Sequence, residues 1–440
     1  MANDPLGLPI DATAEDHLAR QGLRIGLVDA GDDTRLRPWF EAVVRGFLDP
    51  VPTDATYAEI VPDYADHRTT AVWDESAAEP EVPVGTVSAW PNALTVSPGR
   101  SLDAWAISAV TVAPSHRRRG IARALLEAEL RTAAAAGIPL AMLTVSEATI
   151  YGRYGFGPAA QAAEIDVQTR RAGWVGGTAT GRVQMVGRER ILADAADLFE
   201  RARLRTPGAI ALTGVLFTRL FGRPSDEADL RERRFVRYDD VDGVPQGFAV
   251  YTVKESEDDF VNSLLRVHQL VAVTDEADAA LWRFLLEHDL VGRVTAQLRP
   301  VDEPLRWLVA DERALRVRVH DHLWLRILDP VAALSARSYA GPARIDLTVT
   351  DPLGLAEGRF LLDVDPSGTA TITAQSGDGP SGSVSAVTLD AAALGALYLG
   401  GVSAVTLARA GRIVEGEPGA AAVVDRVLRS PVAPALGVWF

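Results

Sequence analysis

Residues 110–122 read VTVAPSHRRRGIA, and this stretch decides the fold. The apolar run from Ala106 to Val112 predicts a strand, which Pro114 ends. The alanine-rich run from Ile121 to Ala136 predicts a helix, because Gly137 follows as a stop signal. A strand, a tight basic loop and a helix in this order indicate an α/β domain.

The loop between the predicted strand and helix has the features of an anion site. Free backbone N–H groups at a helix N-terminus point outward at the positive end of the helix dipole. The small residues Gly120 and Ala122 let a phosphate approach them, and Arg118 and Arg119 add charged donors. Consecutive arginines at this end of a helix oppose its dipole, so they cost stability unless an anion binds there. The alternative is a solvated basic helix start.

The composition indicates a multidomain globular protein. A chain of 440 residues exceeds what one hydrophobic core usually organises, so we expect two or three domains. Lysine and arginine number 44 against 59 aspartates and glutamates, which gives a net charge of −15. This charge disfavours nucleic acid and anionic membranes as partners and suits a cationic one, although acidity also favours solubility alone. The apolar runs are too short for a membrane span.

The chain contains no cysteine, which excludes disulfides, thiolate nucleophiles and cysteine-bound zinc. Any catalysis must therefore use oxygen or nitrogen groups. His320 and His322 share one face of a predicted strand, but no third ligand is obvious near them, so we expect no metal. The N-terminal residues are acidic and interrupted by prolines where a secretory signal would be basic and then apolar. We therefore expect a cytoplasmic protein.

The first predicted domain spans residues 1–157 and has the order β-α-β-β-β-α-β. Its other predicted elements are a strand at Leu23 to Asp29, a helix at Thr34 to Leu48, and strands at Thr69 to Trp73, Val84 to Trp90 and Leu140 to Val145. The middle of this domain is the strand, loop and helix of residues 110–122.

Residues 158–315 repeat this pattern with different chemistry. VHQLVAVTDEADAALWRFLL, from Val267 to Leu286, lies where the first region has ISAVTVAPSHRRRGIARALL. This indicates an internal duplication, although a strand followed by a helix also arises by chance. In place of the arginines and glycine, the second copy has Asp275, Glu276 and Asp278, which repel a phosphate. We therefore expect only the first copy to hold an anion.

Residues 316–440 form a third predicted domain of strands and glycine-rich turns. It ends with the helical sequence DAAALGALYLGG and a helix near Ala420 to Leu428. This order resembles the sterol-carrier-protein-like fold, an α+β module that has an apolar tunnel in other families. The pattern by itself does not establish lipid binding.

The motif Arg117-x-x-Gly120-x-Ala122, following a strand and opening a helix, resembles that of the GNAT superfamily of N-acetyltransferases. The resemblance implies acetyl-CoA as the co-substrate, with its pyrophosphate on this loop and its pantetheine arm along the preceding strand. The residues implied to contact acetyl-CoA are Val110, Thr111, Val112, Arg118, Arg119, Gly120, Ile121, Ala122, Arg123, Ser146 and Glu147.

A second motif, SEATIYGRYGFG, runs from Ser146 to Gly157 and resembles a segment of the Eis-like aminoglycoside acetyltransferases. In GNAT enzymes the strands beside the cofactor splay apart, so a residue after the later strand can reach the thioester. A phenol with a pKa near ~10 stays protonated at neutral pH and can give its proton to the departing thiolate. The resemblance implies that Tyr151 is this general acid. The alternative for Tyr151 is a packed aromatic in a glycine-rich turn. Tyr154 is interpreted as such a packed aromatic.

The sequence finishes PVAPALGVWF, an apolar end that predicts a docked terminus because most termini are polar and frayed. Burial raises the pKa of an α-carboxyl above its reference near ~3.5 and makes it a better proton acceptor. The resemblance to Eis-like enzymes implies that the main-chain carboxylate of Phe440 is the general base. The alternative is a tail packed only for stability.

The acceptor amine is expected between a carboxylate and aromatic faces. Asp49, at the end of the first long helix, supplies the carboxylate. Trp39, Phe47 and Trp90 supply the aromatic faces. A core or rim position is the alternative for each of these four residues.

These resemblances predict two GNAT-like mixed-sheet domains followed by a sterol-carrier-protein-like α+β domain. They imply direct transfer of an acetyl group from acetyl-CoA to a primary amine of a polycationic small molecule such as an aminoglycoside. Two alternatives stay open: a protein-lysine or polyamine acetyltransferase, and a lipid carrier whose GNAT half is vestigial. The family resemblance also implies a homo-oligomer, specifically a hexamer.

Overall fold

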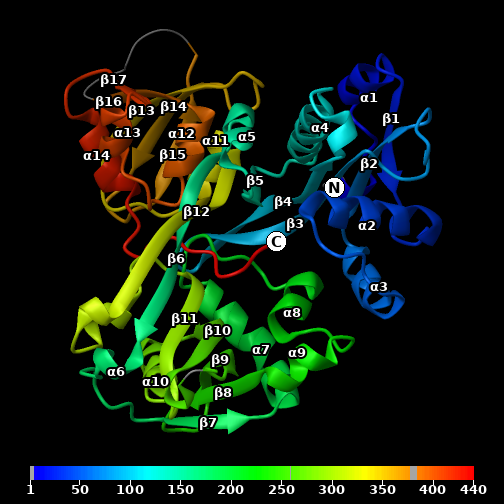
Figure 1. The fold of residues 1–440 in the computed structure, drawn as a ribbon. Helices are drawn as coiled ribbons and strands as arrows, with labels where there is room; N and C mark the ends of the chain where they lie inside the picture. The colour runs from blue at the N-terminus through cyan, green and yellow to red at the C-terminus, as the bar shows by residue number, and fades with distance from the viewer. Residues whose placement is uncertain (1–3, 258, 377–383) are drawn as a thin grey trace.

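The computed structural model describes residues 4–257, 259–376 and 384–440, which form one twelve-stranded sheet and one five-stranded sheet (Figure 1). The twelve strands lie in the order β1-β2-β3-β4-β5-β12-β6-β11-β10-β9-β8-β7. No helix of these residues is long and apolar enough to cross a membrane.

The first half of the large sheet contains the predicted anion loop. Its strands are β1 (Leu23–Val28), β2 (Arg68–Asp74), β3 (Gly85–Ser97), β4 (Arg100–Val112) and β5 (Leu140–Thr144). Its helices are α1 (Ala12–Ala19), α2 (Asp33–Phe47), α3 (Asp54–Ile60), α4 (Ile121–Ala135) and α5 (Ala148–Tyr151). Only β4 and β5 run parallel here, because α4 forms the crossover between them, and the other neighbours are antiparallel.

The second half has the same plan. Its strands are β7 (Arg182–Val186), β8 (Arg234–Asp239), β9 (Pro245–Lys254), β10 (Ser263–Ala272) and β11 (Val291–Arg299). Its helices are α6 (Thr169–Ala172), α7 (Arg188–Arg203), α8 (Gly214–Phe221), α9 (Glu227–Glu232) and α10 (Asp275–Leu286). The β10 and β11 strands are parallel and joined through α10, as β4 and β5 are joined through α4.

The two halves exchange their last strands at the centre of the sheet (Figure 1). After β5 the chain forms β6 (Gly157–Gln168), which pairs with β11 of the second half. After β11 it forms β12 (Leu315–Ile327), which pairs antiparallel with β5 of the first half and also with β6. Neither half therefore has a complete sheet of its own.

This exchange bears on the predicted boundary between residues 315 and 316. This boundary falls at the start of β12 and therefore assigned β12 to the third domain. In the structure β12 pairs within the large sheet instead. The first residues of β12 alternate charged and apolar side chains and are exposed, whereas its last six are all buried. Because the first part of β12 has the pattern of an exposed strand and its last part that of a buried one, the sequence does not indicate which strands it pairs with.

Among the described residues, the third unit is the five-stranded sheet with four helices. Its strands lie in the order β15 (Ala370–Ala374), β14 (Gly358–Val364), β13 (Ala343–Thr350), β16 (Ser385–Asp390) and β17 (Ile413–Glu415). Its helices are α11 (Pro330–Ala336), α12 (Ala391–Leu397), α13 (Ala404–Arg409) and α14 (Ala420–Leu428). Side chains of α12 and α14 pack in one apolar cluster with β3, β5 and β12, so the third unit shares its core with the first half.

Helix α12 packs directly on the junction of β6 and β12. All seven of its residues are buried, and all are alanine, leucine or glycine. A Cβ atom on Gly395 would clash with the carbonyl group of Leu325 in β12, and one on Gly157 would clash with the carbonyl group of Ala392 in α12. The close backbone contact therefore requires glycine on both sides.

We expect Gly395→Ala to destabilise the protein by about 1–3 kcal/mol, because the added methyl group forces α12 away from β12. Gly177→Ala is the matched control, since a Cβ there would lie in open space and the backbone does not require glycine. Chemical denaturation of both variants measures the difference. Equal unfolding midpoints for the two variants would contradict this account of the contact.

Candidate active site

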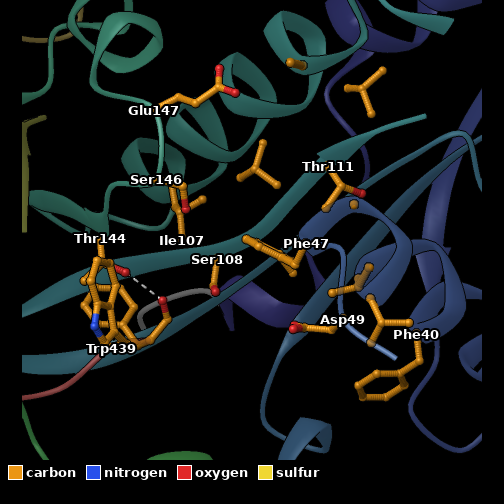
Figure 2. Close-up of a pocket in the computed structure, with 18 of the residues that line it drawn as sticks. Phe40, Phe47, Asp49, Ile107, Ser108, Thr111, Thr144, Ser146, Glu147 and Trp439 are labelled. Atoms are coloured by element: carbon orange, nitrogen blue, oxygen red, sulfur yellow. Dashed lines mark hydrogen bonds between the residues drawn. The ribbon is translucent and has the colours of Figure 1, made fainter. Parts of the chain in front are cut away.

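A cavity of about 1330 Å³ opens between the α2–α3 segment, the end of β4, the start of α4 and the last residues of the chain (Figure 2). Each of the two motifs of the sequence contributes to its wall. The cavity-lining residues that the sequence singled out are Phe47, Asp49, Val110, Thr111, Val112, Arg118, Gly120, Ile121, Ala122, Arg123, Ser146, Glu147, Tyr151, Tyr154, Trp439 and Phe440.

The cavity exists because β4 and β5 separate. They pair only where Ala104–Ala106 lies beside Leu140–Met142. Beyond this point β4 also bulges against β3, and Ala109 takes a positive φ of 53° within the bulge. The main chain of Val110–Val112 therefore faces the space between the two strands instead of pairing with β5.

The basic loop meets the cavity at the N-terminus of α4. Gly120 and Arg118 have φ angles of 75° and 63°, and no side chain caps the helix. Its first N–H groups are thus available to an anion. Arg117 and Arg118 are exposed, and both line the cavity, as does Arg123 from the first turn of α4.

Arg119 has a different position from the one expected, because it does not line this cavity. Its guanidinium group lies 3.4 Å from Asp74 and donates a hydrogen bond of 2.8 Å to the carbonyl of Gln21. His116 lies 3.1 Å from the same carboxylate. Hydrogen bonds from Ser76, His116 and Arg119 hold the pKa of Asp74 far below its usual value. Arg119 thus fastens the loop to β2.

Tyr151 is the last residue of α5 and lies half-buried in the cavity wall. Its ring meets Phe156 edge to face, with 6.3 Å between ring centroids. Burial, reinforced by the nearby Glu147 and Tyr154, raises the pKa of the Tyr151 phenol above its usual value. The phenol therefore stays protonated at neutral pH and can act as a proton donor. Tyr154 is buried more deeply, against α4 and β5 side chains.

The last residue of the chain lies in the body of the protein. A main-chain oxygen of Phe440 accepts a hydrogen bond of 2.8 Å from the hydroxyl of Thr144, the last residue of β5 (Figure 2). The Phe440 ring is buried and meets Trp90 of β3 edge to face at 5.8 Å. Trp439 lies in the cavity wall and stays partly exposed.

The four residues expected around an acceptor divide into two pairs. Asp49 and Phe47 line the cavity near the end of α2 (Figure 2). Trp39 is fully buried in the core beneath α2, where its indole N–H donates to the carbonyl of Thr70 at 3.1 Å. Trp90 is buried between Phe440 and His67 and supports the terminus from behind. Trp39 is therefore a core residue, and Trp90 lies behind Phe440 rather than in the cavity wall.

Sequence reasoning missed several lining residues, among them Phe40, Tyr64, Ser108 and Thr144. Thr144 is the most informative, because it bonds the last residue of the chain. It stands at the end of a buried strand with no motif around it, so nothing local in the sequence indicates its role. Within the part of the chain that the structure describes, no group of three or more potential ligands could hold a metal ion.

The geometry suits transfer of an acyl group from an anionic carrier. One wall offers helix N–H groups and arginines to phosphates, and the splayed strands offer main chain to an extended arm. The Tyr151 phenol and the last residue, Phe440, both line the same cavity. A proton donor at this position suits the departure of a thiolate during acyl transfer.

Comparison with known domain families confirms the three-part organisation. Residues 28–159 match the description Acetyltransferase (GNAT) domain, and residues 215–327 match a second family of the same description. Residues 330–437 match the description Sterol carrier protein domain. The predicted fold class, two GNAT-like regions followed by a sterol-carrier-like domain, is thus confirmed.

Relatives extend over most of the chain. An N-acetyltransferase of Streptomyces avermitilis is 34% identical over 427 residues, which cover 92% of this chain and 98% of that protein. N-acetyltransferase Eis of Mycobacterium tuberculosis is 35% identical over 316 residues, or 70% of this chain and 73% of that protein. The crystal structure of Eis1 from Mycobacterium abscessus superposes with a TM-score of 0.77 at 27% identity, covering 94% of this chain and all of that one.

A half-buried histidine behind the terminus predicts how stability depends on pH. His67 stacks on Trp90 at 4.1 Å, and burial lowers its pKa from 6.5 to about 4. Because the folded-state pKa lies below the unfolded one, the stability from neutral His67 is present above pH 6.5 and is lost as pH falls through about 4. We expect thermal unfolding midpoints of His67→Phe to fall less between pH 7 and pH 4 than those of the wild type. The comparison variant is His288→Phe, in the second half, where the histidine ring packs against Tyr251 and Phe284.

Proposed function

Because the chain belongs to the Eis-like family of GNAT N-acetyltransferases, we propose that it transfers the acetyl group of acetyl-CoA to a primary amine of a cationic small molecule such as an aminoglycoside. The observation that carries this proposal is the single cavity shared by the α4 N-terminus, Tyr151 and Phe440. A protein with a vestigial first half would have no reason to keep all three on one cavity.

Acetyl-CoA enters this scheme from the α4 side. Its pyrophosphate binds the first N–H groups of α4, with Arg118 and Arg123 as charged donors. Its pantetheine arm follows the main chain of Val110–Val112 into the opening between β4 and β5. Ser146 and Glu147, which follow β5, form the opposite wall. The second half has Asp275, Glu276 and Asp278 at the start of α10, so we propose one acetyl-CoA per chain.

The reaction is a direct transfer. The acceptor enters as an ammonium ion and gives one proton to the Phe440 carboxylate. The amine nitrogen then forms a bond to the thioester carbonyl carbon, and the carbon–sulfur bond breaks. The departing thiolate takes the Tyr151 phenolic proton, and the nitrogen, which still carries one proton more than an amide, returns that proton to the Tyr151 phenolate. The first proton leaves the Phe440 carboxyl to solvent, so each proton has a stated donor and acceptor. The Thr144 hydroxyl holds the carboxylate in place from the strand behind it.

The acceptor approaches between the α2–α3 segment and the chain terminus. Asp49 and the Phe440 carboxylate provide negative charge there, and Phe47 provides an apolar face. The net charge of −15 supports a cationic acceptor. Polyamines and lysine side chains share this chemistry. A screen of aminoglycosides, polyamines and lysine peptides with acetyl-CoA tests the acceptor class, and the proposal expects the aminoglycosides to react fastest.

We further propose a cytoplasmic homo-oligomer, a hexamer by family resemblance, with domain boundaries near 157 and 315. The exchange of β6 and β12 supports treating the two GNAT halves as one folding unit, and this unit includes β12, which runs past residue 315 to Ile327. Sedimentation of the purified protein measures the oligomeric state directly.

We expect Tyr151→Phe to lower kcat by roughly 10²–10⁴-fold, since the thiolate would leave without a positioned proton donor. Binding of acetyl-CoA, measured by calorimetry, should stay unchanged. Tyr154→Phe is the matched control and should lower kcat less, because Tyr154 belongs to the packed core of α4 and β5. The reverse ranking of the two variants would assign the acid to Tyr154.

We expect two glycines appended after Phe440 to reduce kcat by about 10²-fold or more, because they displace the carboxylate while every side chain stays in place. Phe440→Leu keeps the carboxylate and should be less damaging. For the wild type, kcat/KM should rise with pH until the acceptor ammonium no longer competes for its proton. An extended enzyme with full activity would remove Phe440 from the mechanism.

A further inference from the structure

The second GNAT half retains the splayed strands of an acyl-CoA cleft. β10 and β11 pair only from Ser263 to Val267 against Val291 to Ala296 and then separate, as β4 and β5 do. β10 also bulges against β9 at His268, the position that aligns with Ser108 beside the β4 bulge. The geometry of the opening is therefore repeated, although the acidic start of α10 disfavours a phosphate.

The opening between β10 and β11 holds the chain's own tail. Two cavities of about 730 and 620 Å³ lie beside this opening, and both are lined by residues 267–269 of β10, Gln297 and Leu298 of β11, and Gly437 and Val438 of the tail. A Cβ on Gly437 would lie 3.7 Å from the side-chain nitrogen of Gln269 and 3.9 Å from the carbonyl oxygen of Leu298. The tail thus crosses between the parted strands just before it reaches the active site.

His322 fixes the tail at this crossing. Nε2 of His322 lies 2.9 Å from the carbonyl oxygen of Val438, and its ring meets Trp439 edge to face at 4.4 Å. The residue occupies a bulge of β12 against β6, since Asp321 pairs with Gln161 and Leu323 with Ala160. A bulge of this kind redirects a side chain. Here it provides a contact two residues from the proposed catalytic carboxylate.

The protonation of His322 follows from its surroundings. The side chain is completely buried, and burial lowers its pKa to about 4, so the ring is neutral at physiological pH. A carbonyl oxygen only accepts, so the ring proton resides on Nε2. Among the described residues, Nδ1 is buried without a hydrogen-bond partner. The ring's single N–H is therefore committed to the tail.

We propose that the second GNAT half keeps its splayed cleft as a holder for the tail, and that His322 is the positioning residue that sets the Phe440 carboxylate against Thr144. This inference rests on the proposed role of the carboxylate as base. His322 touches neither reactant in this scheme. It acts through the backbone of Val438 and the ring of Trp439.

The first test distinguishes the loss of the His322 N–H donor from the loss of side-chain volume. His322→Leu removes the N–H donor and should lower kcat about 10–100-fold, the loss expected for a catalytic group displaced by about 1 Å. The KM for acetyl-CoA should not change, because the α4 site lies on the other side of the cavity. His322→Gln places an amide N–H near the Nε2 position and should recover most of the kcat, whereas the shorter His322→Asn should not. His320→Leu is the matched control on the same strand and should behave as the wild type.

The second test combines His322→Leu with the two-glycine extension. If His322 acts only by positioning the carboxylate, the substitution should cost nothing further once the carboxylate is displaced, so the two losses should not add. Equal losses of kcat in both backgrounds, or no loss in the unextended enzyme, would overturn this inference. Loss of kcat in His322→Asn gives the same information if His322→Leu fails to fold. Full activity of the extended enzyme would instead overturn the proposed base, which separates the two failures.

Discussion

The pairing of β12 between β5 and β6 is the interaction on which the rest of the molecule depends. Its backbone hydrogen bonds join two half-sheets that are each incomplete, and they remove the exposed edge that β5 would otherwise present. The same strand carries His322 toward the tail and forms part of the surface on which α12 packs. One strand from the second half thereby supports the active site of the first half and the docking of the third unit.

The sequence predicted local structure well where a single strand or helix determines it. The loop at residues 110–122 and the helix after it follow from the composition and from the stop signals Pro114 and Gly137. The structure has α4 at Ile121–Ala135. β3 is longer than its apolar run suggested, since Pro91 and Asn92 interrupt the run without interrupting the strand. β4 is longer because it begins in the polar residues Arg100 and Ser101. The exchange of β6 and β12 was not predictable, because pairing partners far apart in the chain leave no local pattern.

The candidate site also divides into residues that local sequence predicts and residues that depend on distant partners. Gly120, Val110 and Tyr151 lie on the cavity as their motifs indicated, because a motif and its backbone geometry are local. Arg119 and Trp39 do not, because their partners, Asp74 and the carbonyl of Thr70, lie in a distant strand. Thr144 and His322 were missed as tail contacts for the same reason. They contact the last residues of the chain, which lie far from them in the sequence and reach them only in the folded protein.

The strand exchange also has a consequence for synthesis on the ribosome. β5 ends at Thr144, but its neighbour β12 begins only at Leu315, so the growing chain carries β5 with one open edge while the second half is being made. At ~5–20 residues per second this interval lasts on the order of ten seconds or more. An open and largely apolar strand is a template for pairing with other chains during that time. The order of the strands along the chain therefore makes the completion of β12 the step that ends this exposure.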